Sequence, residues 1–182
     1  MEQKRLTQFQ EQQKTKPDIE AFISENLEGD ASEAVLDFIT HLRSNHLPPK
    51  WSSWNGWKSK YKGKCICSVN LPLGIYDTHT WNVMPNLVYM DLYEESIINE
   101  GLQQMIWDNV FYCVHDKKSS YSGKGCSPDK ACAGGSNRII LGKEIRGICR
   151  CRPNPIFCNP DKTTIGVIKR LLEFEQMARK AL

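Results

Sequence analysis

Residues 54–71 read WNGWKSKYKGKCICSVNL, and this stretch decides the fold class. Apolar and polar side chains alternate on both sides of Lys62-Gly63, a pattern typical of a β-hairpin with a tight turn. The alternation groups Trp57, Ser59 and Tyr61 on one face before the turn, and Cys65, Cys67, Val69 and Leu71 on one face after it. We therefore expect antiparallel strands at the centre of the fold.

Helical and strand patterns follow outward from this hairpin. Helices are expected over residues 17–27, 30–45, 94–112 and 160–182, where apolar residues recur at helical spacing. Asn159 is the expected N-cap of the last helix. Further strands are expected over 74–85 and, on both sides of Gly142, over 138–151. The order α-α-β-β-β-α-β-β-α predicts an α+β fold, with an antiparallel sheet of about five strands and helices packed on it.

Composition places the chain among globular proteins. It has 182 residues, of which 40% are apolar and 25% charged. No stretch approaches the roughly 18 apolar residues of a membrane span, and the start MEQKRLTQFQEQQKTK lacks the apolar core of a secretory signal. We expect a cytoplasmic protein without a membrane partner, with a flexible arm over residues 1–16 and a single domain over 17–182.

Cysteines gather in the second half of the chain, around a loop insertion over residues 113–137 that is rich in Gly and Ser. A loop of this length needs something to order it, and four thiolates on a structural zinc ion would do so. The C-x2-C spacing of a tight zinc knuckle is absent. The predicted zinc ligands are Cys113, Cys126, Cys132 and Cys149.

Other uses of these thiols stay open. Cys151, Cys158 or His115 can substitute for one of the four ligands, and the cysteines can also be unrelated buried or exposed thiols. A thiol-based enzyme or redox sensor would use Cys126 or Cys132, ionised by neighbouring lysines. Cys65 and Cys67 are interpreted as small core residues.

Aromatic residues near the hairpin suggest a ligand groove. Trp54, Trp57, His79 and Trp81 are the predicted ligand-binding residues, because aromatic side chains can line a pocket for an apolar or cationic ligand. The alternative is that the hairpin packs its aromatics into the core and leaves its lysines in water. His79 has the chemistry of a general base but no readable nucleophile beside it, and Asp77 next to it also fits a turn.

Positive charge is concentrated with the thiols. Residues 114–152 carry nine Lys or Arg and three acids, a local charge of +6 in a chain whose net charge is +3. This segment and the Lys-rich hairpin predict, as an alternative function, binding to nucleic acid. No phosphate-loop spacing, H-E-x-x-H, G-x-S-x-G or paired-carboxylate motif is present, which favours a non-enzymatic protein and leaves the thiol-based enzyme as an alternative.

The element order and the strand–YKGK–strand hairpin after an N-terminal helix resemble small uncharacterised bacterial domains of the YjbR-like or YdhG-like kind. The resemblance covers residues 30–112 and 138–182, and the thiol loop departs from it. It implies a bacterial source and a compact α+β fold, and it carries no catalytic residues to this chain. The expected function is that of an intracellular binding domain, stabilised by structural zinc, whose aromatic-lined groove receives a small ligand or a protein.

Overall fold

The computed structural model describes residues 2–71, 80–110, 135–149 and 154–182, with side chains from residue 9 onward. These residues fall into two compact units. Unit 1 comprises Met1–Tyr89 and Phe157–Leu182, and unit 2 comprises Met90–Ile156. The prediction of one domain over 17–182 stays a prediction, since compactness alone does not define a domain. The predicted α+β class with an antiparallel five-stranded sheet is confirmed.

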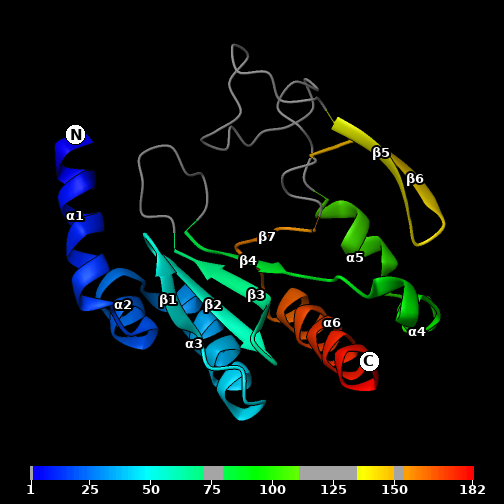
Figure 1. The fold of residues 1–182 in the computed structure, drawn as a ribbon, viewed down its shortest axis with the longest axis horizontal. Coiled ribbons are helices and arrows are strands. Elements are labelled where there is room, and N and C mark those ends of the chain that lie inside the picture. Colours follow the sequence, from blue (N-terminus) through cyan, green and yellow to red (C-terminus); the bar gives the residue numbers. More distant parts are fainter. Residues whose placement is uncertain (1, 72–79, 111–134, 150–153) are drawn as a thin grey trace. The chain divides into compact units, whose positions relative to one another are not determined.

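The sheet of unit 1 is built around the predicted hairpin. It consists of β1 (Lys50–Ser53), β2 (Gly56–Tyr61), β3 (Lys64–Asn70), β4 (Asn82–Pro85) and β7 (Phe157–Cys158), in this spatial order (Figure 1). All neighbouring strands are antiparallel. The β2–β3 turn is made by Lys62 and Gly63, both with positive φ (47° and 79°), as a two-residue hairpin of matching twist requires.

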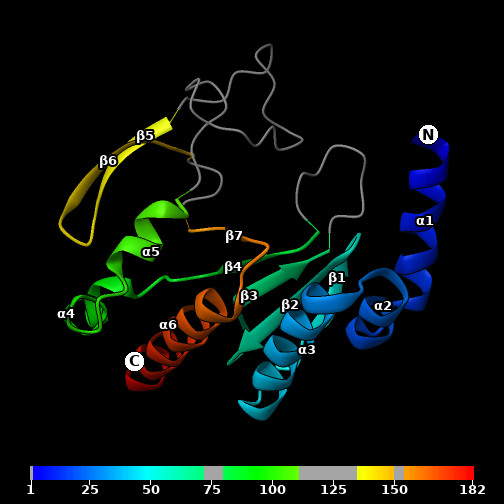
Figure 2. The ribbon, with the colours of Figure 1, turned by 180° about the vertical axis from the view of Figure 1, so that it is seen from behind.

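Helices cover the face of this sheet on which Trp57 lies. They include α2 (Ile19–Asn26), α3 (Gly29–Ser44) and α6 (Lys162–Ala181), and α2 and α3 lie in front of the strands in Figure 2. The apolar stripes of α3 and α6 are buried, as their helical spacing predicted. The buried residues of these stripes include Val35, Phe38, Ile39, Leu42, Ile165, Ile168, Leu171 and Leu172.

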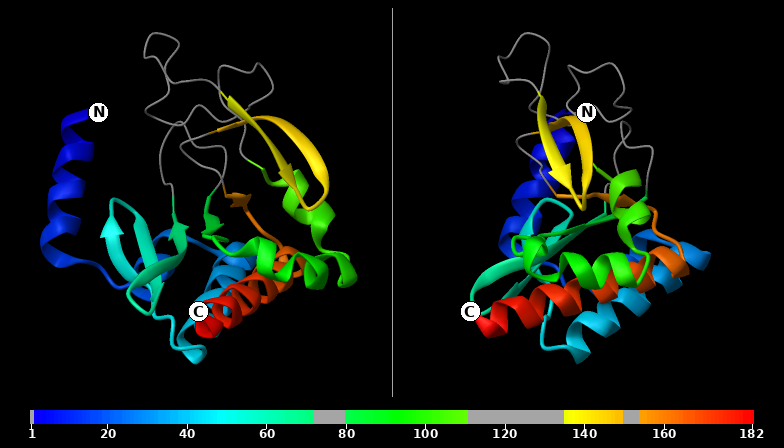
Figure 3. Two further views of the ribbon diagram at one scale, coloured as in Figure 1. Left: turned by 45° about the vertical axis from the view of Figure 1, so that its right-hand side comes forward. Right: turned by 90° about the vertical axis from the view of Figure 1, so that its right-hand side faces the viewer.

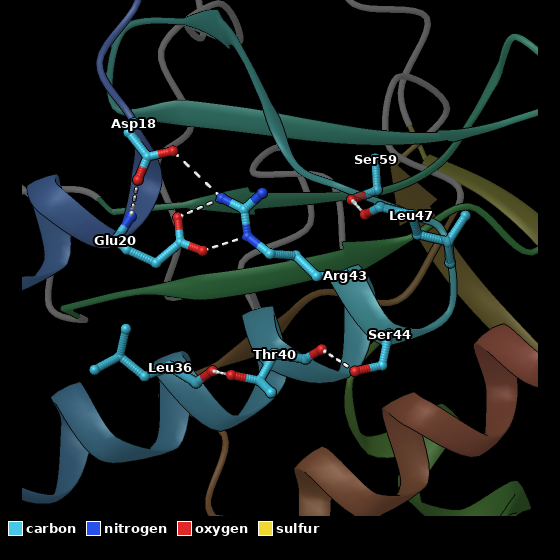
Figure 4. Close-up of polar contacts among 8 residues, drawn as sticks. All are labelled: Asp18, Glu20, Leu36, Thr40, Arg43, Ser44, Leu47 and Ser59. Atoms are coloured by element: carbon cyan, nitrogen blue, oxygen red, sulfur yellow. Dashed lines mark hydrogen bonds and ion pairs between the residues drawn. The ribbon is translucent and has the colours of Figure 1, made fainter.

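Polar contacts fix α2 against α3 and α3 against the sheet (Figure 4). Arg43 forms an ion pair with Glu20, in which its Nη2 donates to Oε2 at 2.6 Å, and it contacts Asp18 at 3.3 Å. The hydrogen bond to Glu20 raises the pKa of Arg43. Ser59 on β2 donates to the carbonyl of Leu47 at 2.7 Å, which ties the segment after α3 to the sheet.

Residues 2–15 form α1 (Glu2–Thr15), where polarity alone suggested a loose arm. It lies at the edge of the sheet beside β1 (Figure 3). Gln12 holds it there, because its Oε1 accepts from the backbone N of Asn55 at 2.9 Å and its Nε2 donates to Asn55 Oδ1 at 2.6 Å. Hydrogen bonds between two residues so far apart in sequence leave no periodic pattern from which they could be predicted.

Unit 2 contains the remaining predicted elements. The helix expected over 94–112 is divided into α4 (Glu94–Asn99) and α5 (Gln103–Asp108), and the short 3-10 helix η1 (Met90–Tyr93) precedes it. The division falls at Gly101, whose φ of 68° does not fit a right-handed helix. β5 (Gly135–Ile140) and β6 (Lys143–Cys149) form a separate two-stranded sheet and are not part of the five-stranded one. Trp107 donates from Nε1 to the carbonyl of Ile140 at 2.8 Å, and Lys143 stacks on its ring.

Candidate ligand-binding cavity

A cavity of about 670 Å³ opens in unit 1 where three segments meet. They are the first turns of α3, the residues that lead into β4, and the connection from β7 into α6. Small-molecule sites commonly have volumes of about 300–1,000 Å³. The lining residues are Asp30, Ala31, Ala34, Thr80, Trp81, Asn159, Pro160, Asp161, Lys162 and Thr163.

Asn159 joins two of these segments. Its Oδ1 accepts from Thr80 N at 2.8 Å, Thr80 Oγ1 at 2.9 Å and Trp81 N at 3.2 Å. Its own backbone N donates to Trp81 O at 3.0 Å. The residue has a φ of 43°, a left-handed conformation that Asn tolerates better than most residues. This side chain therefore fixes the wall of the cavity next to β4.

The N-cap of α6 is Asp161, two residues after the predicted Asn159. Asp161 Oδ1 accepts from Thr164 N at 2.7 Å, and this hydrogen bond lowers the pKa of the carboxyl. Asn159 instead makes the cross-strand contacts described above. Sequence reasoning missed this exchange of roles because Asn and Asp are almost equally good N-caps.

The cavity combines an apolar floor with a polar rim. Trp81 and Ala34 on the floor are 1% and 8% exposed, and Pro160 is buried. The rim side chains are exposed and carry two carboxylates and one ammonium group among hydroxyl and amide groups. Such a site can hold a molecule by apolar contact and orient it by hydrogen bonds. Among its described residues, the lining contains no Cys, His or Ser, and no arrangement of a nucleophile with a base. The rim residues are Asp30, Thr80, Asn159, Asp161, Lys162 and Thr163.

The three predicted ligand-binding tryptophans are not gathered at one place. Trp81 lines the cavity, whereas Trp57 is 1% exposed and packs on Phe22, with ring centroids 5.1 Å apart. The indole Nε1 of Trp57 donates to the carbonyl of Pro17 at 2.9 Å. Trp54 is half-buried in the β1–β2 turn and is not among the lining residues, and His79 lies outside the described residues.

Most of the predicted zinc ligands lie outside the described residues. These are Cys113, Cys126 and Cys132, together with the possible substitutes His115 and Cys151. Cys149 is described and is 2% exposed at the end of β6. Among the residues that the structure describes, no three His, Cys, Asp or Glu side chains are grouped as a metal site would need.

The remaining described thiols belong to unit 1. Cys67 is completely buried, as the core interpretation predicted, and burial raises the pKa of its thiol to about 12. Cys65 is half-buried. A register shift pairs Cys65 with Lys60 and Cys67 with Ser59, so the two thiols lie opposite residues from different faces of β2. Cys158 on β7 is exposed.

Comparison with known proteins adds no relative: no protein-family model, no curated protein and no solved structure matches the chain. Within the described ranges, none of the helices has the length and apolar character needed to cross a membrane.

Proposed function

We propose that the protein is a binding domain for a small molecule, and that the cavity of unit 1 is its site. The observation that carries this proposal is the combination of the buried Trp81 floor with a rim of exposed polar side chains. The ligand class that fits has an apolar body, for contact with the floor, and hydroxyl or amine groups at its periphery that the rim oxygens can accept from.

A fragment screen followed by protein NMR tests this site. Fragments that bind there shift the backbone amide signals of Thr80, Trp81 and Thr163. The variant Ala31→Phe places a large side chain on the lining, and we expect it to abolish these shifts. Ala21→Phe is the matched control, because Ala21 is exposed on α2 and does not line the cavity. A screen without such shifts, or shifts that persist in Ala31→Phe, would refute the proposal.

The structural zinc site is a second part of this proposal. It is supported by Cys149, a buried thiol on a strand that follows the cysteine-rich loop. Metal analysis of untagged protein should find about one zinc per chain, and Cys149→Ser should lower that content, whereas Cys67→Ser should not. A zinc content near zero in the unsubstituted protein would remove this part and leave the cavity proposal intact.

A further inference from the structure

Three lysines share one exposed face of the β1–β2 ribbon. Lys58 and Lys60 are exposed, whereas the alternating residues Trp57 and Ser59 are each 1% exposed on the helix-covered face. Lys50 on β1 lies directly opposite Lys58 in the strand register. We call Lys50, Lys58 and Lys60 the lysine face.

The lysine face has no compensating negative charge in its surroundings along the chain. Residues 50–71, which include β1, β2 and β3, contain five lysines and neither Asp nor Glu. Lys62, at the β2–β3 turn, is held by the carbonyl of Arg179 at 3.1 Å. None of the ion pairs formed within the described part of the chain includes a residue of the lysine face.

This arrangement is unfavourable for the isolated protein. Like charges directly opposite each other on neighbouring strands are destabilising, and Lys50 and Lys58 are such a pair. An anionic partner would turn the repulsion into attraction, because each ammonium group can neutralise one phosphate as a point charge.

We propose that the lysine face binds the phosphate backbone of a nucleic acid, independently of base sequence. Contacts to phosphates carry no sequence information, so binding through them does not depend on base sequence. Trp57, which directly precedes Lys58, is buried on the other face and cannot stack on bases. This surface is distinct from the lining of the cavity, and its charge does not come from residues 114–152.

Residues 50–71 expose none of the large apolar side chains that a lipid-binding surface uses, and this favours nucleic acid as the partner. Membrane-binding surfaces combine cations with apolar groups that enter the bilayer boundary. The large apolar side chains that the described residues expose are Phe9, Val88, Leu92, Ile98, Ile139, Met177 and Leu182, and none lies within residues 50–71.

The test is fluorescence anisotropy with a short labelled DNA duplex, titrated at several salt concentrations between about 50 and 200 mM. The measured quantity is the slope of the logarithm of the association constant against the logarithm of the salt concentration. If each of the three lysines contacts one phosphate, this slope should be about 2.7 units less steep in the triple variant Lys50→Gln/Lys58→Gln/Lys60→Gln than in the unsubstituted protein. We also expect its affinity at the lowest salt to fall by more than about tenfold, and duplexes of different sequence to bind alike.

The matched control removes the same charge elsewhere on unit 1. Lys14, Lys16 and Lys180 are exposed and lie off the lysine face, so Lys14→Gln/Lys16→Gln/Lys180→Gln should keep most of the salt slope. Equal losses in both triple variants, or an unchanged slope in the first, would overturn the proposal. So would lysine-face-dependent binding to phosphatidylserine vesicles without binding to DNA. Circular dichroism establishes that each variant is folded.

Discussion

At the scale of single residues, Glu175 holds together parts of unit 1 that are distant in sequence. It is completely buried on α6 and accepts hydrogen bonds from the backbone N of Val88 and Tyr89 at 3.3 and 3.2 Å. Arg179 donates to it at 2.8 Å, and also to the carbonyls of Cys65 and Asn86 at 3.0 and 3.1 Å. The pair therefore ties α6 to β3 and to the segment after β4.

Removing one partner should be costly. Glu175→Ala leaves the guanidinium of Arg179 buried without its counter-charge, and breaking a buried pair in this way costs about 3–5 kcal/mol. Urea denaturation measures the change in the free energy of unfolding. Glu173→Ala is the control, because Glu173 pairs with Arg170 at a site where both side chains are about 40% exposed, and such pairs contribute less than about 1 kcal/mol. Equal losses in the two variants would contradict this role of Glu175.

His41, near the end of α3, should make stability depend on pH. Burial is the main cause that lowers its pKa below 6.5, and Lys169 acts in the same direction, while Glu173 and Asp37 oppose them. The unfolded chain therefore binds a proton at His41 more readily than the folded chain does. The contribution of neutral His41 to the free energy of unfolding is therefore fully present above pH 6.5. It is lost as the pH falls through and below that value.

Urea denaturation at a series of pH values between about 5 and 8 measures this effect, since that is where imidazole titrates. His41→Gln should flatten the curve, because Gln does not titrate. His46, an exposed residue after α3, supplies the control variant His46→Gln, which should retain the slope. A slope that survives His41→Gln would assign the pH dependence to other groups.

At the scale of elements, the β5–β6 hairpin depends on the close approach of two glycines, Gly135 and Gly147. A Cβ built on Gly135 would lie 2.5 Å from the backbone Cα of Gly147, closer than any real contact allows. Gly147 itself has a φ of 78°, which L side chains rarely adopt. The strands β5 and β6 can approach each other this closely only where neither residue has a side chain.

We therefore expect Gly135→Ala to open the hairpin of unit 2. Hydrogen exchange should show lost protection of the β5 and β6 amides, since backbone atoms cannot move aside as a flexible side chain would. Gly166→Ala is the opposite case: nothing lies within 4 Å of its added Cβ in α6, and Ala in a helix is more stable than Gly by about 1 kcal/mol. Unchanged protection of β5 and β6 in Gly135→Ala would show that the ribbon can adjust.

Elements with a local cause were predictable from sequence. The β2–β3 hairpin follows from alternation and a turn of two residues, and α3 and α6 follow from their apolar stripes. The separate β5–β6 sheet was not predictable, because alternation identifies strands but does not reveal which strands pair. For the site, the pattern around Trp81 identified one lining residue, while Trp57 has the same local signature and is buried in the core.

At the scale of the whole molecule, the sheet of unit 1 is completed by two strands, β4 and β7, that are far apart in sequence. These strands are antiparallel neighbours, with Val83 opposite Phe157, yet the 71 residues 86–156 separate them in sequence. The β2–β3 turn closes with only two residues, Lys62 and Gly63. Periodicity predicts individual strands but not the pairing of strands that are so far apart in sequence. The position of β7 beside β4 was therefore not predictable.

The long connection predicts the order of folding events. Loop-closure entropy rises with loop length, so bringing β7 to β4 across 71 residues costs more than closing the two-residue turn. Pairing of β7 with β4 should therefore come after the β2–β3 hairpin has formed. Phe157→Ala removes a completely buried side chain from β7, at a cost of about 3–5 kcal/mol. Because this loss arises late in folding, it should appear mainly as faster unfolding.

Stopped-flow kinetics in urea separates the two rates. Val69→Ala, at a position 1% exposed on β3, is the counterpart within the early hairpin and should slow refolding. Phe157→Ala should thus change mainly the unfolding rate, and Val69→Ala mainly the refolding rate. This comparison requires that each variant changes the free energy of unfolding by more than about 0.6 kcal/mol. If Phe157→Ala slowed refolding in proportion to its loss of stability, β7 would already be paired with β4 in the transition state, and the late pairing of β7 would be refuted.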